Sequence, residues 1–238
     1  MYFAELYEDS VKDAILAAPV LFLPLGATEV HGAHLPLATD TILAEGITQL
    51  AAKKIAGSLI LPTIPYGQVW SLRDFPGSID VSNNTLIHFI VDIGKSLDRA
   101  GAKKFAVINT HFGNFTAMKE AARILFRDCT IKPYYFTYPG AEKIIEKVCE
   151  SKQPHKSYVH ACEIETSYML YLSKDKVKME KAIINYPDYP PDFDNSPVPW
   201  SKVLKTAVMG DATKATPEKG KAIIDAVADA IVEIIMNS

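Results

Sequence analysis

The stretch LPLGATEVHGAHLPLATDT, residues 23–41, connects an apolar run to a segment with helical periodicity. The run VLFLPL at 20–25 is short and continuous, as expected of a buried strand. The segment TILAEGITQLAAKKIAG at 41–57 has helical spacing and ends at Gly57, a residue that favours the position after a helix. A strand, a connection and a helix in this order predict the first part of a βαβ unit.

The same alternation continues along the chain. Further strands are expected at 58–66, 105–109 and 131–138, and helices at 83–101, 114–128, 140–151, 162–173 and 216–236. Strands that alternate with helices predict an α/β fold, with a mostly parallel sheet covered by helices on both faces. We expect one domain over residues 1–238.

Composition narrows the class of protein. The 238 residues include 25 Lys and Arg against 28 Asp and Glu, and this balance does not favour nucleic-acid binding. No apolar run is long enough for a membrane span, and the acidic N-terminus does not resemble a signal peptide. The cysteines form neither a disulfide framework nor a zinc signature: Cys129, Cys149 and Cys162. We therefore expect a reduced, cytoplasmic protein.

Candidate metal ligands lie within the opening stretch. Glu29 and His31 are two residues apart, so in extended chain both side chains point the same way. Asp40 lies where the following helix begins, beyond the carboxyl end of the first strand, where ligands gather in such folds. The alternatives are a solvated pair for Glu29 and His31 and a helix cap for Asp40. His34 is expected to form hydrogen bonds rather than to bind metal.

Two later segments add groups of the same kind. His111 follows the apolar strand at 105–109, although alone it is equally consistent with a core histidine. His160 and Glu163 are three residues apart, as neighbours on one helical face are, whereas Glu165 would point elsewhere in a regular helix. Imidazole and carboxylate ligands suit zinc, manganese or iron(II), and more than four of them indicate two ions.

Five segments, in order, resemble motifs of the creatininase (creatinine amidohydrolase) family. The opening stretch resembles GxxExHGxHLPxxTD, and the others are YGQVWSLRDFPGSI (66–79), NTHFGN (109–114), HACEIETS (160–167) and GDATKATPEKG (210–220). The resemblance covers nearly the whole chain. It implies a three-layer α/β/α sandwich, usually a homohexamer, with a two-metal site and a small-molecule substrate.

The resemblance also implies a ligand scheme. Glu29, Asp40 and His111 would hold one ion, while His31 and Asp40 would hold the other, so that Asp40 bridges them. The last ligand of creatininase is a Glu two residues after the histidine that matches His111, where this chain has Gly113. We therefore assign the last ligand to Glu163 in HACE, as in other branches of the family. His160 matches the histidine proposed for proton transfer.

The substrate region departs from creatininase. Two tryptophans near the creatininase site correspond here to Lys156 and Pro139, so creatinine is not expected as the substrate. Trp70, Ser71 and Arg73 lie where the family places substrate-contacting groups. Arg73 suits a phosphate or carboxylate, or an exposed salt bridge.

These features predict a two-metal hydrolase of a C–N amide-type bond, cyclic or formamide, that uses metal-activated water. The alternatives are a formamidopyrimidine-nucleotide deformylase, a precursor-peptide peptidase, a hydrolase or lyase-isomerase of oxidised inositols, and a non-catalytic metal-binding assembly protein. The proline-rich segment 185–200 is expected to be a surface connection, or else a lid or subunit-contact loop.

Overall fold

The computed structural model describes residues 1–238 and contains a central sheet of four parallel strands. In chain order these are β1 Leu21–Leu25, β2 Leu59–Ile60, β3 Lys104–Asn109 and β4 Lys132–Thr137. Their order in the sheet is β2-β1-β3-β4. Leu25 at the end of β1 pairs with Asn109 at the end of β3. The two central strands therefore deliver the segments that follow them to the same edge of the sheet.

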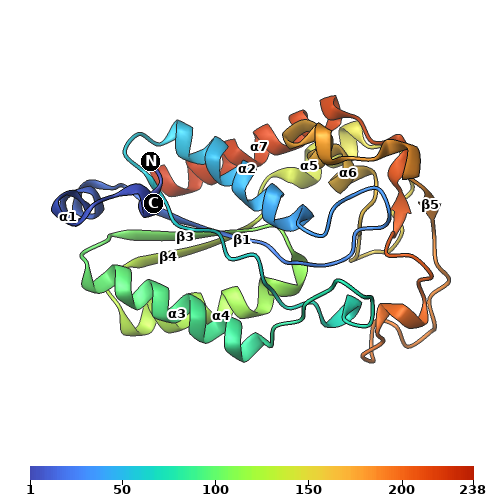
Figure 1. Ribbon diagram of the computed structural model, residues 1–238, viewed down its shortest axis with the longest axis horizontal. Helices are drawn as coiled ribbons and strands as arrows, with labels where there is room; N and C mark the ends of the chain where they lie inside the picture. The colour runs from blue at the N-terminus through green and yellow to red at the C-terminus, as the bar shows by residue number, and fades with distance from the viewer.

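Helices cover both faces of the sheet (Figure 1). One layer contains α3 Asn83–Arg99 and α4 Phe115–Asp128. The opposite layer contains α2 Thr39–Lys54, α5 Ala141–Val148, α6 Glu163–Leu172 and α7 Pro217–Met236. Residues of β1 and the residue before it point alternately into two separate cores: Leu21 and Leu23 belong to one, and Val20 and Phe22 to the other. The expected three-layer α/β/α sandwich is confirmed.

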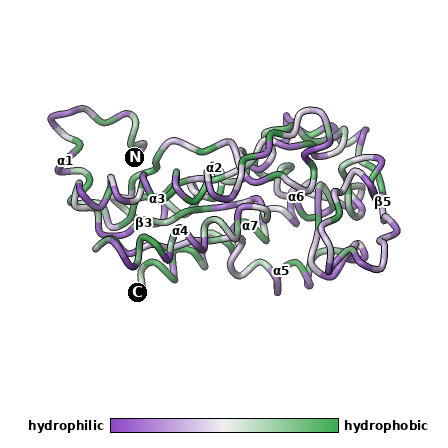
Figure 2. The backbone as a smooth tube through the Cα atoms, turned by 90° about the horizontal axis from the view of Figure 1, so that it is seen from below, coloured by the Kyte–Doolittle hydropathy of each residue, from purple (hydrophilic) through white to green (hydrophobic).

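Several predicted boundaries shift. Helix α2 begins two residues earlier than expected, and the strand expected at 58–66 is confined to β2, because prolines 62 and 65 lack the N–H group that a sheet requires. Two further features were not expected: helix α1 Glu8–Ala17, and the antiparallel pair of β5 Ile184–Asn185 and β6 Gly210–Asp211. Figure 2 places α1 and β5 at opposite ends of the molecule.

Short 3₁₀ helices occupy many of the connections. They are η1 Phe3–Glu5, η2 Trp70–Leu72, η3 Phe112–Asn114, η4 Lys174–Lys176, η5 Met179–Lys181, η6 Trp200–Lys202 and η7 Ala212–Lys214. None of the helices combines the length and the apolar character that crossing a membrane requires.

The proline-rich segment 185–200 is fastened to neighbouring loops. Asp194 forms ion pairs with His155 (3.2 Å) and Lys156 (2.8 Å). Just beyond the segment, the Ser201 hydroxyl donates to Asp74 Oδ2 at 2.6 Å. These contacts fix the segment over the carboxyl edge of the sheet.

Candidate metal centre and active site

Four of the predicted ligands meet at the carboxyl ends of β1 and β3. Glu29 and His31 follow β1, His111 follows β3, and Asp40 lies in the first turn of α2. Close packing at Gly26 brings α2 to this edge, since a Cβ atom there would lie 2.5 Å from the Thr41 backbone nitrogen. Gly26 therefore allows Asp40 to lie beside the end of β1, and any larger residue at position 26 would push the backbone of α2 away.

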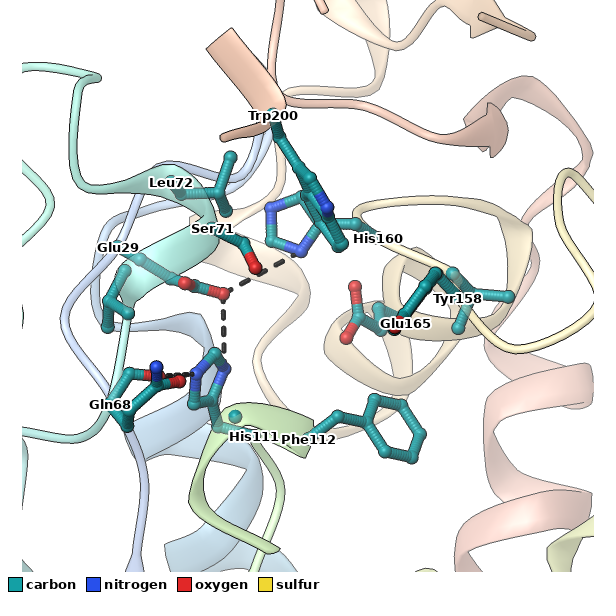
Figure 3. Close-up of a pocket in the computed structure, with 13 residues that line it drawn as sticks. Glu29, Gln68, Ser71, Leu72, His111, Phe112, Tyr158, His160, Glu165 and Trp200 are labelled. Atoms are coloured by element: carbon teal, nitrogen blue, oxygen red, sulfur yellow. Dashed lines mark hydrogen bonds and ion pairs between the residues drawn. The ribbon is translucent and has the colours of Figure 1, made fainter. Parts of the chain in front are cut away.

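The side chains form a tight cluster in which all but the half-buried His111 are buried, and Figure 3 shows Glu29 and His111 together with His160 and Glu165. His111 Nδ1 lies 3.2 Å from Glu29 Oε1 and 3.4 Å from Asp40 Oδ2. His31 Nε2 lies 3.6 Å from Asp40 Oδ1 and 4.0 Å from Glu165 Oε2. Each imidazole thus faces carboxylate oxygens rather than a hydroxyl or amide group.

Backbone carbonyls orient three histidines. In each ring, the nitrogen that points away from the carboxylates lies within hydrogen-bond distance of a carbonyl oxygen, an arrangement common around metal-binding histidines. The pairs are His31 Nδ1 with Glu29 O (3.2 Å), His111 Nε2 with Gln68 O (2.7 Å) and His160 Nε2 with Val30 O (2.7 Å). Donation to the carbonyl leaves the inward nitrogen free to bind a cation or accept a proton.

Surrounding charge shifts the pKa values of the inward histidines. Burial alone would lower the pKa of His31, but Asp40, Glu165 and Glu29 outweigh it and raise the value to about 9. Burial also opposes protonation of His111, yet Glu29 and Asp40 hold its pKa well above the usual range. Without a metal, protons therefore neutralise part of the carboxylate charge.

The other members of the cluster respond differently. Burial, followed by the charge of His31, lowers the pKa of His160 to about 4. Burial raises the pKa of Glu165 to about 7, against the opposing effect of His31. Burial also disfavours the charged form of Asp40, but His31 and His111 overcome it and keep its pKa below the usual range.

The donor set fits two cations. His31 Nε2 and Asp40 Oδ2 are buried without a hydrogen-bond partner, which is costly unless another species completes the site. Asp40 belongs to two groups of potential ligands, and within each group the ligand atoms lie within 4.8 Å of one another. The first group is Glu29, Asp40 and His111, and the second is His31, Asp40 and Glu165. A third group combines Glu29, His31 and His160.

The structure contradicts the assignment of Glu163. Its fully buried carboxylate points away from the cluster, where it pairs with Lys219 (2.5 Å) and accepts backbone N–H groups of Glu150 and Ser151. Helix α6 begins at Glu163, so His160 lies outside it and the three-residue helical spacing does not apply. Glu165 faces the cluster instead.

The local backbone explains this exchange. Ala161 has a φ of 49°, which turns the chain between His160 and α6. The Ala161 N–H donates to Glu165 Oε2 at 2.5 Å, and this contact aims the carboxylate toward His31. The position of the creatininase ligand is also closed: a Cβ atom at Gly113 would lie 2.2 Å from the Gln68 carbonyl oxygen.

A cavity of about 130 Å³ opens onto the cluster. Ser71 lies in its wall, whereas Trp70 and Arg73 lie outside the lining. The Arg73 guanidinium stacks 5.0 Å from the Trp70 ring centroid, and its Nε lies 3.8 Å from Asp74. Of these three residues, Ser71 alone lies where it could contact a substrate in this cavity.

Two aromatic residues that sequence reasoning missed cover this cavity, Trp200 and Tyr158. The Trp200 ring lies 5.8 Å from the His160 ring and 5.7 Å from the Tyr158 ring (Figure 3). The signal was the aromatic, proline-rich segment that ends at Trp200. Lys156 and Pro139 do not line this cavity.

His34 takes the hydrogen-bonding role expected of it. Its Nε2 lies 2.9 Å from the Thr166 hydroxyl of α6, away from the carboxylates of the cluster. Burial lowers the pKa of His34 to about 4. A neutral His34 therefore links the connection after β1 to α6.

This combination defines an α/β protein with a carboxylate–imidazole centre of the kind that serves metal-assisted hydrolysis. Residues 4–235 match the family described as Creatininase, creatinine amidohydrolase. The chain belongs to that family and is a hydrolase.

Curated relatives and solved structures agree. The chain is 26% identical to creatinine amidohydrolase of Pseudomonas putida, over 91% of this chain and 88% of the relative. It is 29% identical to mycofactocin precursor peptide peptidase of Mycobacterium tuberculosis, over 89% of this chain and 82% of the relative. A mutant creatininase of the Zn–Zn type superposes with a TM-score of 0.88 at 26% identity, covering 99% of this chain and 97% of that one.

Proposed function

We propose that this protein is a two-metal hydrolase of a C–N amide-type bond, cyclic amide or formamide, in a small molecule other than creatinine. The observation that carries the proposal is the position of Asp40, whose carboxylate belongs to two ligand groups at once. Glu29 and His111 complete one group, and His31 and Glu165 complete the other. Zinc, manganese and iron(II) suit these donors.

When bound, two divalent ions lower the pKa of water and polarise a carbonyl oxygen. Asp40, placed between His31 and His111, would hold both ions in register. Glu29 and Glu165 supply the remaining negative charge. The buried surroundings of these side chains exclude bulk water and strengthen each electrostatic interaction.

His160 is the proposed proton carrier. The backbone carbonyl of Val30 accepts the hydrogen bond from Nε2 (2.7 Å), which leaves Nδ1 to accept a proton. Nδ1 lies 3.7 Å from Glu29 Oε1 and therefore beside the candidate ligands. Because its pKa is lowered, His160 is neutral near pH 7 and can accept a proton and pass it to the leaving nitrogen.

The cavity wall argues for a substrate other than creatinine. The residues that replace the two creatininase tryptophans, Lys156 and Pro139, do not contribute to it, and the cover comes from Trp200 and Tyr158. A formylated aminopyrimidine nucleotide, a precursor peptide and an oxidised inositol ring are the alternative substrates. The homohexamer stays a prediction, which analytical ultracentrifugation would check.

A hydrolysis screen tests the proposal. Protein loaded in turn with zinc, manganese and iron(II) is incubated with creatinine, a formylaminopyrimidine nucleotide and inositol-derived ring compounds in ¹⁸O-labelled water. We expect one of the non-creatinine compounds to be cleaved with incorporation of ¹⁸O. A product without ¹⁸O would indicate an isomerase or lyase, and cleavage of creatinine alone would refute the substrate argument.

A further inference from the structure

A second cavity, of about 380 Å³, lies beside the first and has no role in the proposed proton transfer. We call it the α5 chamber, because residues of α5 and of the connection to α6 line it. The two cavities share Phe112, Val159 and Glu165 as walls. A molecule that enters the chamber therefore passes directly beside a candidate metal ligand.

The two cavities differ in the size of the group that each can hold. A buried apolar cavity of about 150 Å³ is large enough for benzene. The first cavity, at about 130 Å³, is thus slightly smaller than a cavity that takes one benzene ring. The α5 chamber is almost three times as large and can take a ring system.

Aliphatic and aromatic side chains form part of the wall of the α5 chamber. Ile145, Ile164, Tyr138 and Tyr168 contribute to the wall. The Tyr138 hydroxyl donates to the Thr110 carbonyl oxygen at 3.2 Å. The Tyr168 side chain is only 2% exposed, and its hydroxyl, which reaches solvent, is not used in a hydrogen bond within the protein. It can therefore donate a hydrogen bond to a ligand that carries an acceptor.

Apart from Glu165 on the shared wall, the charged residues around the chamber balance. Lys152 and Lys156 line it together with Glu142 and Glu146, and Lys156 is already paired with Asp194 at 2.8 Å. No excess of positive charge is present to bind a phosphate or another anion. The chamber therefore suits an uncharged group.

We propose that the α5 chamber binds the non-reacting part of the substrate, an uncharged aromatic or heteroaromatic group whose hydrogen-bond acceptor meets the Tyr168 hydroxyl. The inference rests on the proposed function, because the cleaved bond must lie at the metal cluster while the ring occupies the chamber. The substrate is then larger than a single small ring, and its two parts lie on either side of the Glu165 wall.

The test uses two probes that differ in one acceptor, N-benzylformamide and N-(4-acetylbenzyl)formamide. Binding to the manganese-loaded full chain is measured by NMR, in which a nearby Mn²⁺ ion speeds the relaxation of probe protons. Ile145→Trp fills the chamber, and Lys143→Trp places the same side chain at an exposed position on α5 outside the lining. We expect Ile145→Trp to weaken both probes about tenfold to a hundredfold, the effect of losing one buried ring, and Lys143→Trp to leave both unchanged.

Tyr168→Phe is the second test, because it removes only the hydroxyl. It is expected to weaken the acetyl probe about threefold to tenfold, the range of one hydrogen bond, without changing the binding of the plain probe. Equal losses for both probes would overturn the assignment of Tyr168. A wild-type protein that binds neither probe, or an Ile145→Trp variant that binds both normally, would overturn the chamber itself.

Failure of the proposed function gives a different pattern. A protein that takes up no metal lacks the relaxation effect, but line broadening of the probes still compares Ile145→Trp with Lys143→Trp. Probes that bind near the metal without being cleaved would contradict the formamide reaction and leave the chamber supported.

Discussion

Two glutamates of α6, two residues apart, are expected to respond in opposite ways to the same isosteric change. Glu165 lies 4.0 Å from His31 Nε2 within a group of candidate ligands, whereas Glu163 pairs with Lys219 outside the cluster. Glu165→Gln should therefore reduce metal binding, and Glu163→Gln should reduce stability.

The size of the metal effect follows from the role of the carboxylate. Changing a residue that only supports a ligand weakens metal binding about 10- to 100-fold. Loss of a direct carboxylate ligand in Glu165→Gln should exceed about 100-fold for the ion beside His31. Elemental analysis after dialysis should then find about one ion per chain in place of about two, since Asp40 still serves the other group.

The size of the stability effect follows from burial. Glu163 is fully buried and the Lys219 side chain is 11% exposed, and breaking such a pair costs about 3–5 kcal/mol. Lys219 retains Glu150 as a partner at 2.9 Å, so we expect a loss near 3 kcal/mol, or about 6–12 °C in Tm for a chain of this size. In chelator, Glu165→Gln should keep or raise the Tm, because burial already raises the pKa of that carboxyl to about 7.

Thermal unfolding with and without chelator, together with elemental analysis, separates the two variants. The reasoning fails if Glu163→Gln loses metal at an unchanged Tm while Glu165→Gln keeps its full metal content. It also fails if the two variants behave alike in both measurements.

Four further changes test other parts of the site. Asp40→Ala should remove both ions, and unchanged metal content by elemental analysis would contradict a shared ligand. The zinc affinity of the metal-free protein should rise between about pH 6 and about pH 9, because metal must displace protons from His31, whose pKa is raised to about 9, and from His111. Competition with a chromophoric chelator measures this affinity, and an affinity that does not change with pH would count against these ligands. Trp200→Ala should raise KM about tenfold or more with little change in Tm, since the ring covers the cavity beside His160, whereas an unchanged KM would place the ring outside the substrate site. Gly113→Ala should displace His111 and lower the stability by about 1–3 kcal/mol, because its Cβ would lie 2.4 Å from His111 Nε2; full activity and an unchanged Tm would refute the close packing.

Local sequence patterns predicted most of the fold. The continuous apolar run at 20–25 and the helical spacing after it correspond to β1 and α2, and the remaining alternation gave the parallel sheet. Patterns with fewer apolar residues were missed. Helix α1 is short, and Ile15 is its only buried residue, with Val11 and Ala14 partly buried beside it. The two-residue strands β5 and β6 pair only because the folded chain brings them together.

Three of the four predicted ligands that the structure brings together follow strand ends, and the fourth, Asp40, lies in the first turn of α2. Glu29 and His31 needed only the two-residue period of extended chain, and His111 needed only the end of β3. Glu163 was wrong because its direction depends on where α6 begins. The turn at Ala161, with its positive φ, separates His160 from the helix, and no local pattern indicates that turn.

In the proposed two-metal site, the last carboxylate ligand comes from a different element than in creatininase. In the creatininase scheme the last carboxylate follows the β3 histidine, but close packing of Gly113 against Gln68 leaves no room for a side chain there. Glu165 instead comes from α6, so the ligand is only as well placed as that helix. The Glu163–Lys219 pair ties the first residue of α6 to α7, and the Ser167 hydroxyl, 2.6 Å from the Glu163 carbonyl oxygen, accepts the Thr216 N–H at 3.1 Å.

These contacts give the C-terminal motif at 210–220 a physical role. Its Lys219 lies outside the cluster, yet it neutralises the buried Glu163 carboxylate at the first residue of α6. A weakened Lys219 contact should therefore affect the ion held by Glu165 and His31 before the ion held by Glu29 and His111. Glu163, first assigned as a ligand, thus acts by holding α6 in place, and α6 carries Glu165, the candidate ligand.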